Sequence, residues 1–151
     1  MRPHMSPTMN TPWTTRGIAA VIALACAAPL VVACTLVPSV TGMDTHRQLG
    51  LPACGWPMSF GIPCFTCGMT TSFALAVRGR FLAALDAQPA GFVLVCAAAL
   101  GVVVAAWVAI SGRSVHRFLQ PLATGRLAIL ACVVILAGWG WKLAVMKGLF
   151  A

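Results

Sequence analysis

The residues best suited to do chemistry in this chain are two cysteines, Cys64 and Cys67, in the motif Pro-Cys-Phe-Thr-Cys-Gly. Pro63 suits a helix start, and the Ala, Leu, Met and Phe residues that follow predict a helix over residues 64–85. Unpaired amides and the positive end of a helix dipole stabilise a thiolate and lower its pKa. Because the CxxC spacing also lets the two sulfurs meet, the motif indicates thiol chemistry.

Three further residues could support these thiols. On an ideal helix that includes the motif, Thr71 and Arg78 fall within an arc of about 60° that also holds both cysteines. One face of an otherwise apolar helix would then be polar, and the cationic Arg78 would favour a thiolate. Cys54, ten residues before Cys64, could supply a third sulfur.

Three interpretations of this cluster stay open. The first is thiol–disulfide exchange, with Cys64 as the more exposed nucleophile and Cys67 as its partner. The second is a metal site that adds Cys54 and, as a fourth ligand, His46, although a single CxxC falls well short of a zinc signature. The third is structural, with a disulfide or buried thiols that fix the preceding loop to the helix. No phosphate-binding loop, carboxylate pair or Ser/His/Asp set is present, so no complete catalytic set is recognised and no cofactor is expected.

The elements that carry the motif are those of a membrane protein. Of the 151 residues, 60% are hydrophobic and 8% are charged, whereas a soluble domain has about 45–50% apolar and about 25% charged residues. This composition excludes a soluble enzyme with its own core. Residues 1–16 are predicted to be a flexible tail, and residues 17–151 a single polytopic membrane domain.

Three apolar segments are long enough to cross the roughly 30 Å hydrocarbon layer. They cover residues 17–40, where Pro29 should kink the helix, residues 90–110 and residues 127–146. The helix at 64–85 is shorter, because its charge-free part covers only about 21 Å. The predicted fold is therefore an all-α integral membrane bundle of three long transmembrane helices and one shorter helix that bears the CxxC motif.

The charges of the chain indicate a lipid partner. Ten basic residues against two acidic ones give a formal net charge of +8. The basic residues stand singly at the ends of apolar runs, where cations reach lipid headgroups, so membrane lipid is the expected partner and nucleic acid is not. Near the end of the last span, Lys142 and two tryptophans are predicted to be interfacial anchors.

One helix face could bind a second protein. Residues 97, 101 and 105 are small and recur every four residues in the predicted span 90–110. Such a face lets another helix approach closely, either from a protein partner or from a second copy of the chain. The face consists of Ala97, Gly101 and Ala105.

The motif and its surroundings resemble the bacterial membrane-protein family catalogued as domain of unknown function 2752. The likeness covers about residues 51–94 and rests on G-I-P-C-F-T-C-G-M-T from Gly61 to Thr70, on Arg78-Gly79 and on Gln88-Pro89. Two positions depart from the family pattern, since Phe65 replaces the usual proline and Thr71 stands where many members carry arginine. The resemblance implies a small multi-pass protein of the bacterial inner (cytoplasmic) membrane, with no established activity.

The function expected from the sequence is a thiol-redox or thiol-stabilised site at the CxxC motif of such a membrane protein. A non-enzymatic module with a structural or partner-binding role is the alternative, since the chain lacks a complete catalytic set. A Cys/His metal site is a second alternative.

Overall fold

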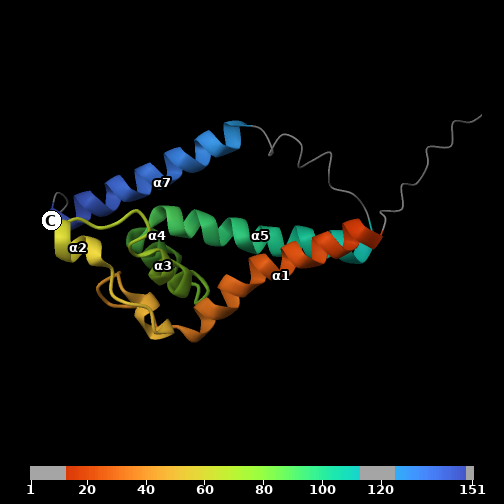
Figure 1. Ribbon diagram of the computed structural model, residues 1–151, viewed down its shortest axis with the longest axis horizontal. Coiled ribbons are helices and arrows are strands. Elements are labelled where there is room, and N and C mark those ends of the chain that lie inside the picture. The colour runs from red at the N-terminus through yellow and green to blue at the C-terminus, as the bar shows by residue number, and fades with distance from the viewer. Residues whose placement is uncertain (1–12, 113–124, 149–151) are drawn as a thin grey trace, which may run out of the picture.

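A computed structural model describes residues 13–112 and 125–148, and every regular element in these ranges is a helix (Figure 1). Three helices are long: α1 (Trp13–Thr35), α5 (Pro89–Ser111) and α7 (Gly125–Met146). Four are short: η1 (Thr45–Leu49), α2 (Gly55–Phe60), α3 (Met69–Ala76) and α4 (Phe81–Ala87). The long helices α1 and α5 lie side by side, and the short helices gather at one end of this pair.

Two of the three predicted spans are long and apolar enough to cross a membrane. These are α1 and α5, of 23 residues each, which corresponds to about 35 Å of helix. The third predicted span is also helical, as α7, but its described apolar stretch, Ile129–Val145, is shorter. The structure is thus all-helical with two candidate spans.

The ends of these helices differ from the sequence prediction. α1 begins at Trp13, so residues 13–16 are helical and do not belong to the predicted tail, and it ends at Thr35 rather than at residue 40. Pro38 disfavours helical backbone in the residue before it, which fits an end at this point. The rest of the predicted tail, residues 1–12, lies outside the described residues, as do residues 113–124.

The prediction of one helix over residues 64–85 is wrong. Cys64 and Cys67 precede the first helical residue, Met69. Gly68 adopts a φ of +88° and Gly79 a φ of +74°, values that glycine tolerates and an α-helix does not contain. The chain therefore forms a turn at the cysteines, a short α3, a second turn and a short α4. The common polar face predicted from ideal helix spacing does not exist.

The core of the molecule lies around α3. Six consecutive residues of this helix, 71 to 76, are buried between α1, α4 and α5. Ser72 donates a hydrogen bond to the Ala84 carbonyl at 2.8 Å and lies 3.2 Å from the carbonyl oxygen of Gln88. A Cβ on Gly91 would lie 2.9 Å from the Ser72 Cβ, so glycine is what lets α5 approach α3 this closely.

Two arginines donate hydrogen bonds to the last carbonyl groups of α1 and α5. Arg16, near the start of α1, donates to the carbonyl oxygens of Ala109 and Ile110 at the end of α5. Arg78 donates to Ala33 and Cys34 at the end of α1, at 3.2 and 3.1 Å. The last carbonyls of a helix lack intrahelical partners and carry a partial negative charge. The contacts of Arg16 also define α1 and α5 as antiparallel.

The C-terminal half of α7 is docked onto the turns that surround the cysteines. The indole nitrogen of Trp139 donates to the Pro63 carbonyl at 2.9 Å. The ammonium of Lys142 donates to Ala87 at 3.0 Å and to Gly42 at 3.4 Å. Lys142 is only 5% exposed, so its prediction as an interfacial anchor is wrong. The side chain instead joins three segments of the chain.

Candidate thiol site

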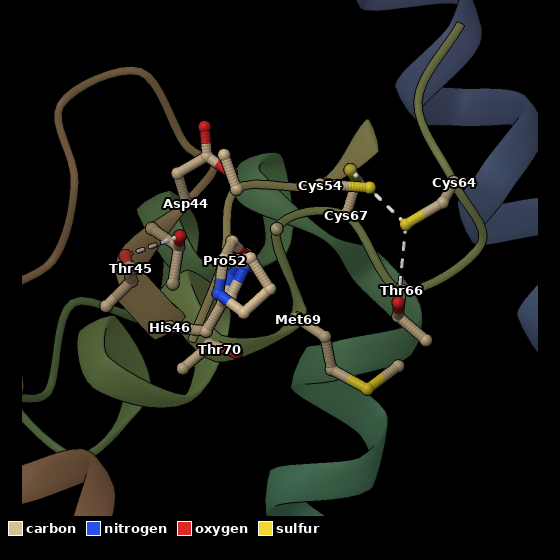
Figure 2. Close-up of a pocket in the computed structure, with 13 residues that line it drawn as sticks. Asp44, Thr45, His46, Pro52, Cys54, Cys64, Thr66, Cys67, Met69 and Thr70 are labelled. Atoms are coloured by element: carbon tan, nitrogen blue, oxygen red, sulfur yellow. Dashed lines mark hydrogen bonds between the residues drawn. The ribbon is translucent and has the colours of Figure 1, made fainter. Parts of the chain in front are cut away.

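Three cysteine sulfurs converge at one point of the structure (Figure 2). The Sγ atoms of Cys54, Cys64 and Cys67 all lie within 4.8 Å of one another, and the Cys64–Cys67 distance is 3.4 Å. Cys54 directly precedes α2, whereas the other two flank the turn before α3. The structure thus brings together the CxxC pair and the third sulfur that the sequence analysis had singled out.

The backbone of the motif fixes the position of two of these sulfurs. The Cys67 amide donates to the Cys64 carbonyl at 3.1 Å, which closes a tight turn. A Cβ on the next residue, Gly68, would lie 2.7 Å from the Ala87 carbonyl oxygen and 2.8 Å from that of Gly42. Only glycine fits between these two backbone segments. The final glycine of the CxxCG motif is therefore a packing requirement.

The sulfurs border a pocket of about 410 Å³. Cys54 and Cys64 are half-buried, whereas Cys67 is buried. The opposite wall is built by η1 and the loop after it, including Thr45, His46 and Pro52 (Figure 2). A reactant that enters this pocket would meet Cys64 before Cys67.

The surroundings of the two CxxC thiols shift their pKa values in opposite directions. Burial raises the pKa of the Cys67 thiol to about 12, and its hydrogen bond with Cys64 adds to this shift. Partial burial also disfavours the Cys64 thiolate. However, hydrogen bonds with Thr66, Cys67 and Cys54 outweigh this effect, and the pKa of Cys64 is lowered. Cys64 is therefore the thiol that ionises first.

The other predicted site residues form their hydrogen bonds away from the sulfurs. The hydroxyl of Thr71 is buried and hydrogen-bonded to that of Thr45 at 2.8 Å, which joins α3 to η1. The guanidinium of Arg78 lies on the carbonyl end of α1. His46 Nε2 is hydrogen-bonded to the Pro52 carbonyl at 3.1 Å. His46 lines the pocket but is not in the group of potential ligand atoms formed by the three sulfurs.

An aromatic row, which the sequence analysis missed, supports the motif from outside. The Phe65 ring lies 4.8 Å from the ring of Trp139 in α7 and 6.0 Å from that of Trp56 in α2. A proline at this position would lack the aromatic ring that makes both contacts. The departure from the family pattern at Phe65 was the signal of a local packing difference.

Two buried polar residues were also missed. Lys142 donates to the backbone segments next to the motif. An ionisable residue inside an apolar segment is by itself a reason to expect a buried polar contact. Gln88 is fully buried, and its amide nitrogen lies 3.4 Å from the Phe65 carbonyl, within hydrogen-bond distance. The Gln88-Pro89 dipeptide, which is part of the resemblance to the family, was the available signal that Gln88 has a role.

The motif and the third sulfur, that of Cys54, lie in one segment that matches a known family. Residues 52–107 match the family model described as "Protein of unknown function (DUF2752)". The match confirms the resemblance stated from the sequence and runs from the loop before Cys54 to near the end of α5. No match to the chain was found among curated proteins or solved structures.

The small-residue face predicted to bind a partner is used in part within the chain. A Cβ on Gly101 would lie 3.1 Å from the sulfur of Cys26 in α1. Ala105 is buried, whereas Ala97 is exposed. Gly101 therefore serves the contact of α5 with α1, and binding of a second protein through this face stays a prediction.

Proposed function

We propose that this protein is a membrane-anchored dithiol–disulfide exchange protein whose reacting groups are Cys64 and Cys67. The carrying observation is the 3.4 Å separation of their sulfurs beside a pocket. At this distance the thiols are hydrogen-bonded but not covalently joined, and a small rotation would bring the two sulfurs into bonding distance. In a disulfide the sulfurs are about 2.05 Å apart.

The two cysteines have different roles in the proposed reaction. The Cys64 thiolate attacks one sulfur of a substrate disulfide, whose S–S bond breaks, and the released sulfur takes up a proton. Cys67 then loses its proton and attacks the Cys64 sulfur of the mixed disulfide, which releases the second substrate thiol. Two electrons pass to the substrate, and a Cys64–Cys67 disulfide remains. The reverse sequence oxidises a substrate dithiol.

Membrane anchoring is supported by the outer surfaces of the long helices. α1 and α5 expose large apolar side chains such as Leu24 and Ile110, which are 71% and 80% exposed. A core helix of a soluble protein would bury such residues, and lipid would cover them. We infer that α1 and α5 cross the membrane, that α7 makes a third crossing, and that the membrane is the bacterial inner membrane implied by the family resemblance.

Thiol trapping on the full chain in lipid nanodiscs tests the proposed exchange. After treatment with oxidised glutathione and then unfolding in sodium dodecyl sulfate, a heavy maleimide probe should fail to label Cys64 and Cys67, and reductant should restore labelling of both. The variant Cys67→Ser should accumulate a mixed disulfide with glutathione at Cys64, because the resolving thiol is gone. The matched control, Cys34→Ser, changes an exposed thiol in α1 and should behave like the unmodified chain. Full labelling of both cysteines after oxidation would overturn the proposal.

A further inference from the structure

We propose that Cys54, Cys64 and Cys67 also form a three-thiolate binding site for Cu(I). This inference does not depend on dithiol exchange, since exchange needs only the CxxC pair. The Cu(I) site needs Cys54 as well.

The positions of the sulfurs suit a single metal ion. A metal–sulfur bond of about 2.3 Å in a trigonal arrangement places the three sulfurs about 4.0 Å apart. The three Sγ atoms here all lie within 4.8 Å of one another, with the closest pair at 3.4 Å. Cys54 reaches the other two from a separate segment of the chain. A dithiol pair by itself does not require such a third sulfur.

The composition of the site favours Cu(I) over other ions. Soft thiolate ligands select Cu(I), zinc and iron–sulfur clusters, whereas carboxylate and carbonyl oxygens select magnesium and calcium. Within the described residues, no histidine nitrogen or carboxylate oxygen joins the group of three sulfurs. A structural zinc site needs four protein ligands, whereas three thiolates complete the coordination of Cu(I).

The surroundings of the sulfurs can accept the charge of such a complex. Binding would release the three thiol protons, and three thiolates around one Cu(I) carry two net negative charges. The Thr66 hydroxyl lies 3.4 Å from the Cys64 sulfur, within hydrogen-bond distance. The buried ammonium of Lys142 donates to the Ala87 and Gly42 carbonyls, the two groups that enclose Gly68 next to Cys67. Both groups stabilise negative charge at the sulfurs.

The two uses of the sulfurs exclude one another at any one time. A Cys64–Cys67 disulfide removes two of the three ligands, and bound Cu(I) occupies both nucleophiles. Oxidation of the pair would therefore release the ion, and Cu(I) should protect the pair from oxidation.

Competition for Cu(I) tests the site. The reduced full chain in nanodiscs would be titrated with Cu(I) against the coloured chelator bicinchoninate, without oxygen. We expect one Cu(I) bound per chain, and a loss of affinity in Cys54→Ser of more than about 100-fold, which exceeds the effect of losing an outer-shell partner. Cys34→Ser is the control and should leave the affinity unchanged. X-ray absorption at the copper edge should count three sulfur ligands.

Two results would overturn the proposal. One is Cu(I) binding that does not change in Cys54→Ser, and the other is tight Zn²⁺ binding at the three sulfurs without competition from Cu(I). The trapping assay on Cys54→Ser separates failure of the Cu(I) site from failure of the exchange function. A variant that still forms the Cys64–Cys67 disulfide keeps both other ligands as reactive thiols, so its loss of Cu(I) reports the missing third ligand.

Discussion

Two thiols of the same motif, Cys64 and Cys67, differ because the first is half-buried and the second is buried. Their sequence spacing indicated a reactive pair but assigned the acidity of Cys64 to a helix dipole. In the structure the cysteines precede α3, and hydrogen bonds with Thr66 and the neighbouring thiols lower the Cys64 pKa instead. The lowered pKa of Cys64 was predictable from residue types. The hydrogen bonds that lower this pKa depend on a turn that the hydrophobic pattern does not encode.

The pH dependence of alkylation should separate these two thiols. In reduced, chelator-treated protein, the rate of Cys64 modification by iodoacetamide should reach half its maximum below pH 9.0, since the thiolate is the nucleophile and its pKa is lowered from 9.0. Cys67 should react only as the pH approaches 12. Thr66→Val should move the Cys64 midpoint upward, because it removes the hydroxyl near Cys64 Sγ. The control Thr70→Val should not, and equal midpoints for both cysteines would contradict the assignment.

Gly68 holds the motif in place through its missing side chain. We expect Gly68→Ala to destabilise the fold and to raise the labelling rate of Cys67, because the new Cβ would meet two backbone carbonyl oxygens. Gly61→Ala is a matched control, since Gly61 also has a positive φ, of +66°, but a Cβ at this position would have no neighbour within 4 Å. Both variants carry the backbone cost of about 1–2 kcal/mol. In thermal unfolding, Gly68→Ala should lose more stability than Gly61→Ala. Equal losses of stability in the two variants would refute the packing argument.

At the scale of helices, the sequence predicted best where the apolar pattern is uninterrupted. The predicted spans 17–40 and 90–110 correspond to α1 and α5 within a few residues at most ends. The prediction failed at 64–85, where hydrophobic composition continues through backbone that Gly68 and Gly79 turn out of the helix. It also missed the docking of α7, because contacts between residues 55 to 100 positions apart have no local signature.

Lys142 should be the side chain that keeps α7 against the thiol site. Lys142→Met retains a long side chain but removes the hydrogen bonds to Ala87 and Gly42. We expect faster maleimide labelling of Cys67 in this variant, because the segments that cover it are no longer joined. The control is Lys147→Met, which removes an exposed lysine directly after the last residue of α7. Unchanged labelling of Cys67 in Lys142→Met would show that α7 stays docked without this contact.

Across the whole molecule, basic residues connect the helices as well as marking their ends. In the sequence, Arg16 and Arg78 are among the basic residues at the ends of apolar runs, where cations reach headgroups. In the structure each donates to the carbonyl end of a long helix, Arg16 to that of α5 and Arg78 to that of α1. The short helices α2 and α3, which follow Cys54 and Cys67 in the chain, lie toward one end of this antiparallel pair (Figure 1). If the pair crosses a bilayer, the site lies at one membrane face.

Lipid should therefore hide thiols that the structure leaves exposed. Cys96 in α5 and Cys132 in α7 are exposed in the isolated chain, whereas Cys64 is half-buried beside the pocket. In nanodiscs, a charged maleimide should label Cys64 and leave Cys96 and Cys132 unlabelled, because a charged reagent does not enter hydrocarbon. After unfolding in sodium dodecyl sulfate, all three should react. Labelling of Cys96 as fast as that of Cys64 in nanodiscs would contradict a crossing by α5. Labelling of Cys132 but not of Cys96 would contradict only the third crossing, by α7.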